Sequence, residues 1–218
     1  MKREILITSD GSTTIHLPDW NEQYHSKNGS INESLHVFIK NGLKEVAAKE
    51  VSILEVGFGT GLNCFITYLE AERKINYVGA EAYPVTSDEV EKMNFISILD
   101  AEKEQKVFEK MHKVSWEEKH NITNEFSLEK RKQFFEEITD ENAFDLIYFD
   151  AFGARVQPQL WTEEIFTKMF IALKENGILV TYSAKGSVRR AMQAVGFTVE
   201  RLPGPPGKRE MLRAIKIS

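Results

Sequence analysis

The sequence predicts an α/β fold with a mostly parallel central sheet, and three observations support this prediction. From Val51 onward, short apolar segments alternate with segments of helical periodicity, which is typical of parallel strands connected by helices. A glycine-rich turn directly follows the first of these strands. The last two strands have no helix between them, so we expect an antiparallel hairpin at one edge of the sheet.

The first elements are predicted ahead of this sheet. Residues 5–17 contain two short apolar segments around Asp10-Gly11, which indicates an N-terminal β-hairpin. Residues 20–46 are polar at first and then have helical spacing. We therefore expect an N-terminal extension, residues 1–46, packed on a core domain, residues 47–218.

The core domain begins with a β–α–β unit. The apolar segment 51–56 is the first strand, and the glycine turn follows it. Apolar residues within 62–69 recur at i, i+3, i+4 and i+7, which predicts a helix with one apolar face. The second strand, 75–80, ends directly before Glu81.

The second half of the core domain shows the same alternation. Residues 84–120 are charged and predicted to be helical, and 122–130 is a third strand. The sequence FDLIYF, residues 144–149, is a buried strand that ends at Asp150. The later predicted elements are a helix at 162–174 that stops at Asn176-Gly177, a strand at 178–183, a helix at 186–195 and two strands at 197–202 and 210–217.

Composition limits the class of protein. The chain has 218 residues, of which 42% are hydrophobic and 28% charged, as is ordinary for a soluble globular protein. The single cysteine, Cys64, excludes an internal disulfide and a cysteine-based zinc site. The five histidines form no HExxH pattern, so we expect no metal. No apolar run approaches the ~18 residues of a membrane span, so we expect a cytoplasmic protein.

The charge of the chain is unevenly distributed. The net charge of −5 and a pI near 5.7 argue against a generally basic nucleic-acid binder. However, residues 185–218 contain eight Lys or Arg against two Glu, so this segment carries +6 and the first 184 residues carry −11.

The glycine turn has the sequence Glu55-Val-Gly-Phe-Gly-Thr-Gly61. A dinucleotide fingerprint needs GxGxxG, and Leu62 stands at its third glycine position. The pattern E-x-G-x-G-x-G suits S-adenosylmethionine, which has an ammonium, a sulfonium and a ribose but no phosphate. Glu55 is then expected near the amino end of this molecule, and Glu81 can accept both ribose hydroxyls. The alternative is a structural turn with a surface glutamate.

Asp150 follows the strand 144–149, at the sheet edge where open α/β sheets bind ligands. We interpret it as an acid that faces the transferred methyl group and its acceptor. The alternative is a loop cap, a frequent role of aspartate.

Three segments of the chain, 24–38, 54–63 and 148–161, resemble the methyltransferase domain of the bacterial MnmC family. This family makes 5-methylaminomethyl-2-thiouridine at the wobble position of tRNA. The match continues through Ser183–Arg190 and Lys208–Met211. The resemblance implies the Rossmann-like sheet of class I SAM-dependent methyltransferases, and it points to the stand-alone, MnmD-type form because 218 residues leave no room for the flavin domain of the best-known members.

The resemblance also implies roles for individual residues. Asp150 is the expected catalytic residue, which orients the amine of 5-aminomethyluridine; whether it also accepts the proton of the amine stays open. Tyr24 and Phe152 are expected to pack around the extruded base, although Tyr24 fits a core position equally well. The adenine-contacting residue stays open, with Glu129 as a candidate. The expected S-adenosylmethionine-binding residues are Glu55, Gly57, Phe58, Gly59, Gly61, Asn63, Glu81 and Asp150, and those for tRNA are Tyr24, Ser26, Glu33, Phe152, Lys185, Arg189, Lys208 and Arg209.

The partners expected from the resemblance are the tRNA anticodon loop and a separate FAD-dependent oxidoreductase that acts on the same nucleoside. We expect S-adenosylmethionine as methyl donor, no FAD, no metal, no membrane association and a monomer. Three alternatives stay open: a small-molecule amine methyltransferase, an enzyme similar to aminopropyltransferases, and a non-catalytic S-adenosylmethionine-binding protein.

Overall fold

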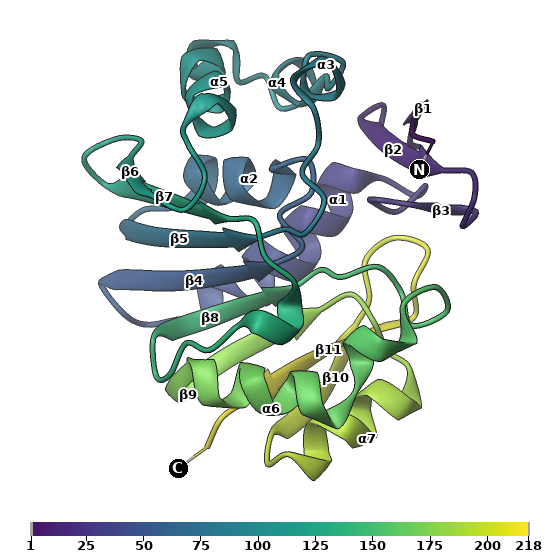
Figure 1. Cartoon of the computed structure of the whole chain (residues 1–218), viewed down its shortest axis with the longest axis vertical. Coiled ribbons are helices and arrows are strands. Elements are labelled where there is room, and N and C mark those ends of the chain that lie inside the picture. Colours follow the sequence, from purple (N-terminus) through teal and green to yellow (C-terminus); the bar gives the residue numbers. More distant parts are fainter. Residues whose placement is uncertain (1, 218) are drawn as a thin grey trace.

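The computed structural model describes residues 2–217. It contains an eight-stranded central sheet with helices on both faces and a small antiparallel sheet beside it (Figure 1). The small sheet consists of β1 (Glu4–Ile7), β2 (Thr13–Leu17) and β3 (Glu22–Gln23). The predicted N-terminal hairpin is confirmed as β1–β2, and β3 adds a strand that the sequence pattern did not indicate.

The central sheet has the strand order β10-β11-β9-β8-β4-β5-β7-β6. Five strands, from β9 across to β7, are parallel to one another. Their carboxyl ends therefore meet along one edge, where ligands of open α/β sheets bind. The bounds of all eight are β4 (Glu50–Val56), β5 (Lys74–Ala80), β6 (Lys119–Asn121), β7 (Phe126–Arg131), β8 (Phe144–Phe149), β9 (Leu173–Thr181), β10 (Thr198–Pro203) and β11 (Glu210–Ile215).

The predicted C-terminal hairpin is confirmed as the antiparallel pair β10–β11. Strand β11 also pairs antiparallel with β9, so of the two hairpin strands it is β10 that lies at the sheet edge. At the opposite edge, β6 pairs antiparallel with β7, although the sequence pattern placed this segment in a helical region. The fold is the expected Rossmann-like α/β architecture, and β6 is an added antiparallel strand at the edge opposite the hairpin.

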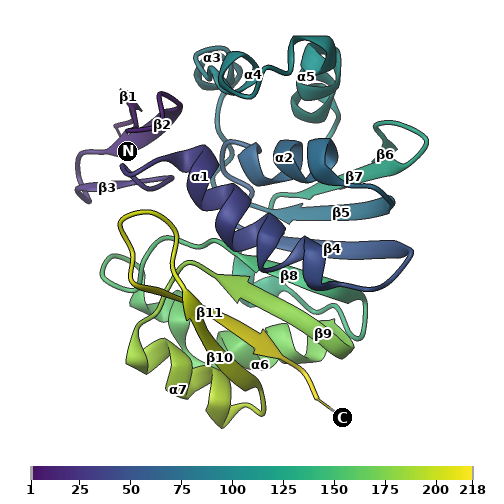
Figure 2. The same cartoon turned by 180° about the vertical axis from the view of Figure 1, so that it is seen from behind.

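Helices cover both faces of the sheet, as the two opposite views show (Figures 1 and 2). On one face, α1 (Ser30–Ser34) continues as the π-helical segment η1 (Leu35–Lys40) and packs beside α2 (Leu62–Glu70). On the other face lie α6 (Glu163–Ala172) and α7 (Gly186–Ala194). Short 3-10 turns occur at η2 (Leu43–Glu45), η3 (Glu102–Glu104), η4 (Phe135–Glu137) and η5 (Pro158–Trp161).

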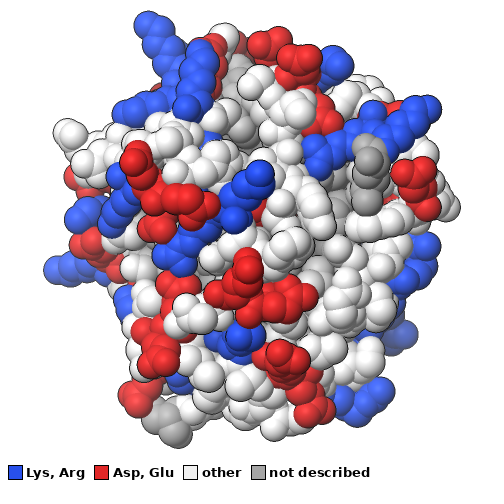
Figure 3. Space-filling view, viewed as in Figure 1, with Lys and Arg blue, Asp and Glu red and all other residues white. Residues whose placement is uncertain are grey.

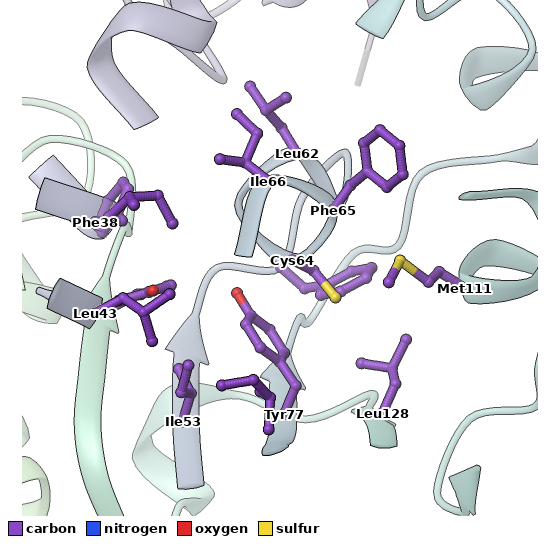
Figure 4. Close-up of a cluster of buried hydrophobic side chains, with 14 of the residues drawn as sticks. Phe38, Leu43, Ile53, Leu62, Cys64, Phe65, Ile66, Tyr77, Met111 and Leu128 are labelled. Atoms are coloured by element: carbon purple, nitrogen blue, oxygen red, sulfur yellow. The ribbon is translucent and has the colours of Figure 1, made fainter. Parts of the chain in front are cut away.

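The alternation of side chains along β4 produces two separate core layers. Ile53 packs with Phe38 and Phe65 from the helices of one face (Figure 4). Its neighbour Leu54 packs with Phe166 of α6 on the other face. Successive strand residues point to opposite faces, and both of these are fully buried, as in a parallel sheet that is covered on both sides.

Two predicted helices differ from those in the structure. Residues 84–120, which were predicted to be helical, form three short helices, and Asp100, with φ 51°, separates the second from the third. The predicted stop of α6 at Asn176-Gly177 is wrong, because the helix already ends at Ala172. Asn176, with φ 61°, lies instead in an irregularity near the start of β9, where the register with β8 shifts. The three short helices are α3 (Ser87–Val90), α4 (Phe95–Ile98) and α5 (Gln105–Lys113).

Across residues 2–217, each helix is too short or too polar to cross a lipid bilayer.

Candidate active site

A cavity of about 1300 Å³ lies at the carboxyl ends of the parallel strands. Residues of the small N-terminal sheet and of the β10–β11 loop complete its wall. It brings together most of the site residues expected from the sequence: Tyr24, Ser26, Glu33, Gly57, Phe58, Gly59, Asn63, Glu81, Asp150, Phe152 and Lys208. The others, Glu55, Gly61, Lys185, Arg189 and Arg209, do not line it.

The glycine turn between β4 and α2 takes a conformation that only glycine adopts easily. Gly57, Gly59 and Gly61 have φ values of 99°, 49° and 74°. A Cβ added to Gly57 would lie 2.7 Å from the carbonyl oxygen of Asp150. The ring of Phe58 packs against Gly79 in the core. The turn therefore brings its backbone close to the cavity and forms a cradle that a side chain at Gly57 would disrupt.

Glu55 and Asp150 are linked by one amide. The Asn63 side-chain nitrogen donates to Glu55 at 2.9 Å and to Asp150 at 2.8 Å. Tyr77 donates its hydroxyl to the other oxygen of Glu55 at 2.8 Å. Burial raises the pKa of Glu55 well above its ordinary value. Glu55 lies behind Asn63, so any influence on a ligand passes through Asn63 rather than through direct contact.

Glu81, directly after β5, is held at the rim of the cavity by backbone donors. Gly59 donates its N–H to one carboxylate oxygen at 3.0 Å, and Tyr83 donates to the other at 2.9 Å. Each oxygen keeps a free lone pair, so the carboxylate can still accept from two hydroxyls of a diol.

Asp150 directly follows β8 and is half-buried in the cavity wall. Burial raises its pKa well above the ordinary value, and the nearby charge of Glu33 raises it further. The hydrogen bond from Asn63 and the charge of Lys208 act in the opposite direction. A carboxyl group with a raised pKa is suited to exchanging a proton with a ligand.

Glu33, Lys208 and Tyr182 form a cluster beside Asp150. Lys208 makes a salt bridge with Glu33, and its ammonium lies 4.0 Å from the centroid of the Tyr182 ring. The Tyr182 hydroxyl donates to the carbonyl oxygen of Ala151 at 2.8 Å. Sequence reasoning missed Tyr182, although its place at the end of the strand predicted at 178–183 is a usable signal.

An aromatic wall faces this cluster. The ring of Phe152 packs edge to face against Tyr24, with 5.0 Å between the ring centroids, and against Trp20, with 5.7 Å between them. Trp20 lies in a polar segment of the sequence, which gave no reason to select it. The Phe152 ring stands nearly at right angles to both of the other rings, and aromatic faces of this kind can stack on a planar group.

Glu129, the candidate for the open adenine contact, lies away from the cavity. Strand β7 runs on to Arg131, so Glu129 lies inside the strand, where it forms a salt bridge of 2.7 Å with Arg131. It does not line the cavity. Past the true end of the strand, the residues that do line it are Lys132, Phe134, Phe135 and Glu136.

The basic residues of the C-terminal segment lie outside the cavity, except for Lys208. Lys185 is exposed before α7, Arg189 is half-buried within it, and Arg209 is exposed in the β10–β11 loop. The face of the molecule in Figure 3 has interspersed acidic and basic side chains rather than one continuous basic surface. Among residues 2–217, no group of three or more His, Cys, Asp or Glu side chains is arranged to hold a metal ion.

A family model and several curated relatives match this chain. Residues 101–217 match a family model described as S-adenosyl-L-methionine-dependent methyltransferase. The chain is 26% identical over 226 residues to the tRNA 5-methylaminomethyl-2-thiouridine biosynthesis bifunctional protein MnmC of Cupriavidus metallidurans, with 95% of this chain and 33% of that protein covered. It thus spans about a third of the length of such curated relatives.

Two solved structures have a similar fold. MnmC2 from Aquifex aeolicus matches with a TM-score of 0.76 and 23% identity over 98% of this chain and 69% of that one. Spermidine synthase from Thermotoga maritima matches with a TM-score of 0.53 and 15% identity over 99% and 72%. At these identities, the likeness shows the fold alone. The resemblance to the MnmC methyltransferase domain is confirmed, and because the family model matches more than half of the chain, the protein belongs to this family of S-adenosyl-L-methionine-dependent methyltransferases, enzymes that take their methyl group from S-adenosyl-L-methionine.

Proposed function

We propose that the protein methylates the 5-aminomethyl amine of the wobble uridine in tRNA. The observation that carries this proposal is that acidic and aromatic side chains share one cavity wall beside the glycine turn, namely Asp150 and Glu33 with Tyr24 and Phe152. The acids suit a cationic amine, and the rings suit the base to which it is attached. The name of the MnmC relatives, which describes biosynthesis of 5-methylaminomethyl-2-thiouridine in tRNA, supports this substrate.

The residues around the glycine turn fit the methyl donor. We assign its amino-acid end to the backbone of Gly57 and Gly59 and to Asn63, supported from behind by Glu55, and its ribose to Glu81. The turn residues Phe58 and Gly61 keep this backbone in shape through their buried positions. When bound, S-adenosyl-L-methionine supplies an electrophilic methyl group on a sulfonium.

The acceptor needs a base before it can react. An alkylamine titrates well above pH 7, so it arrives as an ammonium and must lose one proton. We assign this proton to Asp150, directly or through a water molecule. The freed nitrogen lone pair forms the new N–C bond, and the electron pair of the broken C–S bond stays on sulfur. Positioning of the amine by Asp150 adds to the rate by holding it in line with the methyl group.

The remaining expected contacts concern RNA. We propose that the rings of Tyr24 and Phe152 hold the extruded base, with Ser26 nearby in the wall. Lys185, Arg189 and Arg209 then contact phosphates of the anticodon arm outside the cavity.

We further propose that residues 1–46 act as an extension of the catalytic domain 47–218, because the small sheet contributes to the cavity wall. The protein is proposed to act in the cytoplasm as a monomer, on a nucleoside supplied by a separate FAD-dependent oxidoreductase. A small-molecule amine methyltransferase would use the same acids, and salt-sensitive tRNA binding distinguishes the two functions.

The test is methyl transfer in vitro to tRNA that carries 5-aminomethyl-2-thiouridine, followed by mass spectrometry of the nucleosides. We expect conversion to the methylaminomethyl nucleoside, no reaction with an unmodified transcript, and accumulation of the aminomethyl nucleoside in a strain without the protein. An unchanged nucleoside profile in that strain contradicts the proposal.

A further inference from the structure

Lys208 has an unexpected position for a residue assigned to tRNA phosphates. Its ammonium lies inside the cavity, in a salt bridge with Glu33. Only 30% of the Lys208 side chain and 11% of the Glu33 side chain are exposed. The charge is therefore turned towards the interior of the cavity, away from the outer surface where a phosphate would approach.

The groups around this ammonium are two carboxylates and one aromatic ring. Glu33 accepts a hydrogen bond from it, and Asp150 is close enough that the charges of Glu33 and Lys208 both act on its carboxyl group. Tyr182 presents the face of its ring at 4.0 Å, in an orientation fixed by the hydrogen bond of its hydroxyl to Ala151. Carboxylates beside an aromatic face form a recognition site for an alkylammonium ion.

The end of a lysine side chain is a methylene group that carries a primary ammonium, and an aminomethyl group has the same two atoms. We propose that Glu33, Asp150 and Tyr182 form the binding site for the primary ammonium of the acceptor, and that Lys208 fills this site in the free protein as an internal substitute. This inference rests on the proposed function and names the part of the cavity that takes the amine.

The surrounding loop allows this exchange. Lys208 lies between β10 and β11, next to Gly207, whose backbone packs so closely on Asn28 that a side chain there would collide with it. The long lysine side chain can turn outward by rotation about its own bonds, without a change in the loop backbone. Outside the cavity it meets solvent beside the exposed Arg209, where RNA phosphates can take over the role of Glu33.

The probe for this site is ethylammonium chloride, which carries a primary ammonium on a short alkyl chain and no phosphate. We expect Lys208→Met to bind ethylammonium at least about tenfold more tightly than the wild-type protein, because a tethered competitor of high effective concentration is removed. Binding is measured by NMR titration of the ethyl protons. Lys208→Gln, a second uncharged variant, is expected to show the same gain, whereas Lys208→Arg keeps a cation on Glu33 and should bind as weakly as wild type.

The double variant Lys208→Met/Glu33→Gln tests whether the gain depends on the carboxylate, and we expect it to lose most of the gain. Tetramethylammonium chloride, which has no N–H donor, controls for ionic strength. The matched control is Lys49→Met, since Lys49 is exposed and precedes β4 at the end of the sheet opposite the cavity. Thermal unfolding confirms that each variant is folded.

Equal ethylammonium affinity in the wild-type protein and in the folded uncharged variants overturns the ammonium site. This readout contains no RNA, so it separates the two proposals. A gain in ethylammonium binding without any methyl transfer to aminomethyl tRNA supports the site and contradicts the tRNA substrate alone. Methyl transfer to tRNA without a gain contradicts the site alone.

Discussion

The side-chain amide of Asn63 donates a 2.8 Å hydrogen bond to Asp150, and the same nitrogen donates to the buried Glu55. Burial raises the pKa of both acids, and their shared donor offsets part of the cost of removing water from each carboxyl group. Asn63 thereby connects the end of β4 with the end of β8 and fixes the orientation of the Asp150 carboxyl group.

Replacement of this donor should damage both stability and activity. Asn63→Ala leaves oxygens of Glu55 and Asp150 unpaired, so we expect a loss of about 1–3 kcal/mol in unfolding free energy. The rate of methyl transfer should fall because Asp150 is no longer oriented. Chemical denaturation and steady-state kinetics measure the two effects. Gln193→Ala, which removes an exposed amide on α7, is the control and should change neither.

The proposed proton acceptor can be tested without changing its shape. Asp150→Asn keeps an oxygen that can accept from Asn63 but removes the base, so kcat should fall by about 10²–10⁴-fold. Calorimetry should give an S-adenosyl-L-methionine affinity close to that of the wild-type protein. Turnover within a few-fold of wild type would remove Asp150 from the mechanism.

The glycine turn should not tolerate a side chain at Gly57. Its φ of 99° is strained for any other residue, and an added Cβ would lie 2.7 Å from the Asp150 backbone oxygen. We expect Gly57→Ala to weaken binding of S-adenosyl-L-methionine and to lower the melting temperature. Gly186→Ala, at the start of α7, meets only the flexible end of Arg190 and should keep normal affinity. Similar behaviour of the two variants contradicts the cradle.

The buried imidazole of His25 predicts a pH effect on stability. Its ring nitrogens lie 3.2 Å from the hydroxyls of Thr14 and Thr60, and burial lowers its pKa from 6.5 to about 4, with Asp10 opposing this shift. The folded protein therefore binds fewer protons at this site than the unfolded chain between about pH 6.5 and pH 4. The contribution of the neutral His25 imidazole to the free energy of unfolding is therefore fully present above pH 6.5. It is lost as the pH falls to about 4.

His25→Gln keeps polar contacts to both threonines but cannot titrate. Over that pH interval it should lose less stability than the wild-type protein, by on the order of 1 kcal/mol. Melting temperatures recorded across the interval measure the difference. Parallel curves for the two proteins would show that His25 does not contribute.

The exposed cations near the cavity predict a salt-dependent RNA affinity. Lys185→Glu/Arg209→Glu should weaken tRNA binding and flatten its dependence on salt by about 0.7–0.9 logarithmic units for each phosphate that is no longer neutralised. Affinity for S-adenosyl-L-methionine should not change, because neither residue lines the cavity. Lys49→Glu/Lys74→Glu has the same charge change at the amino ends of β4 and β5, opposite the cavity. An equal drop in tRNA affinity in this control would point to net charge alone.

Residues that end predicted strands were located well from the sequence. Glu81 and Asp150 both lie in the cavity wall, because a strand boundary is a local property and parallel strands align their ends. Glu129, the candidate adenine contact, was misplaced, because it lies within β7, where its side chain pairs with Arg131.

Contacts between distant segments could not be predicted in this way. The salt bridge of Glu33 with Lys208 depends on how α1 and the β10–β11 loop meet across the sheet. The shielding of Glu55 by Asn63 depends on the direction in which α2 leaves the turn. Neither relationship has a signature in spacing or composition, because each is decided by tertiary packing.

Glu33 and Lys208 are separated by 175 positions in the chain. Closing a loop of that length costs more entropy than any neighbouring strand pairing, so the two side chains meet late in folding, after the sheet between them has formed. The contact joins a surface loop to α1, so we expect it to open before the core does. In hydrogen exchange, the β10–β11 loop and α1 should therefore open in smaller, more frequent fluctuations than β4 and β8, which places local opening where the acceptor must enter.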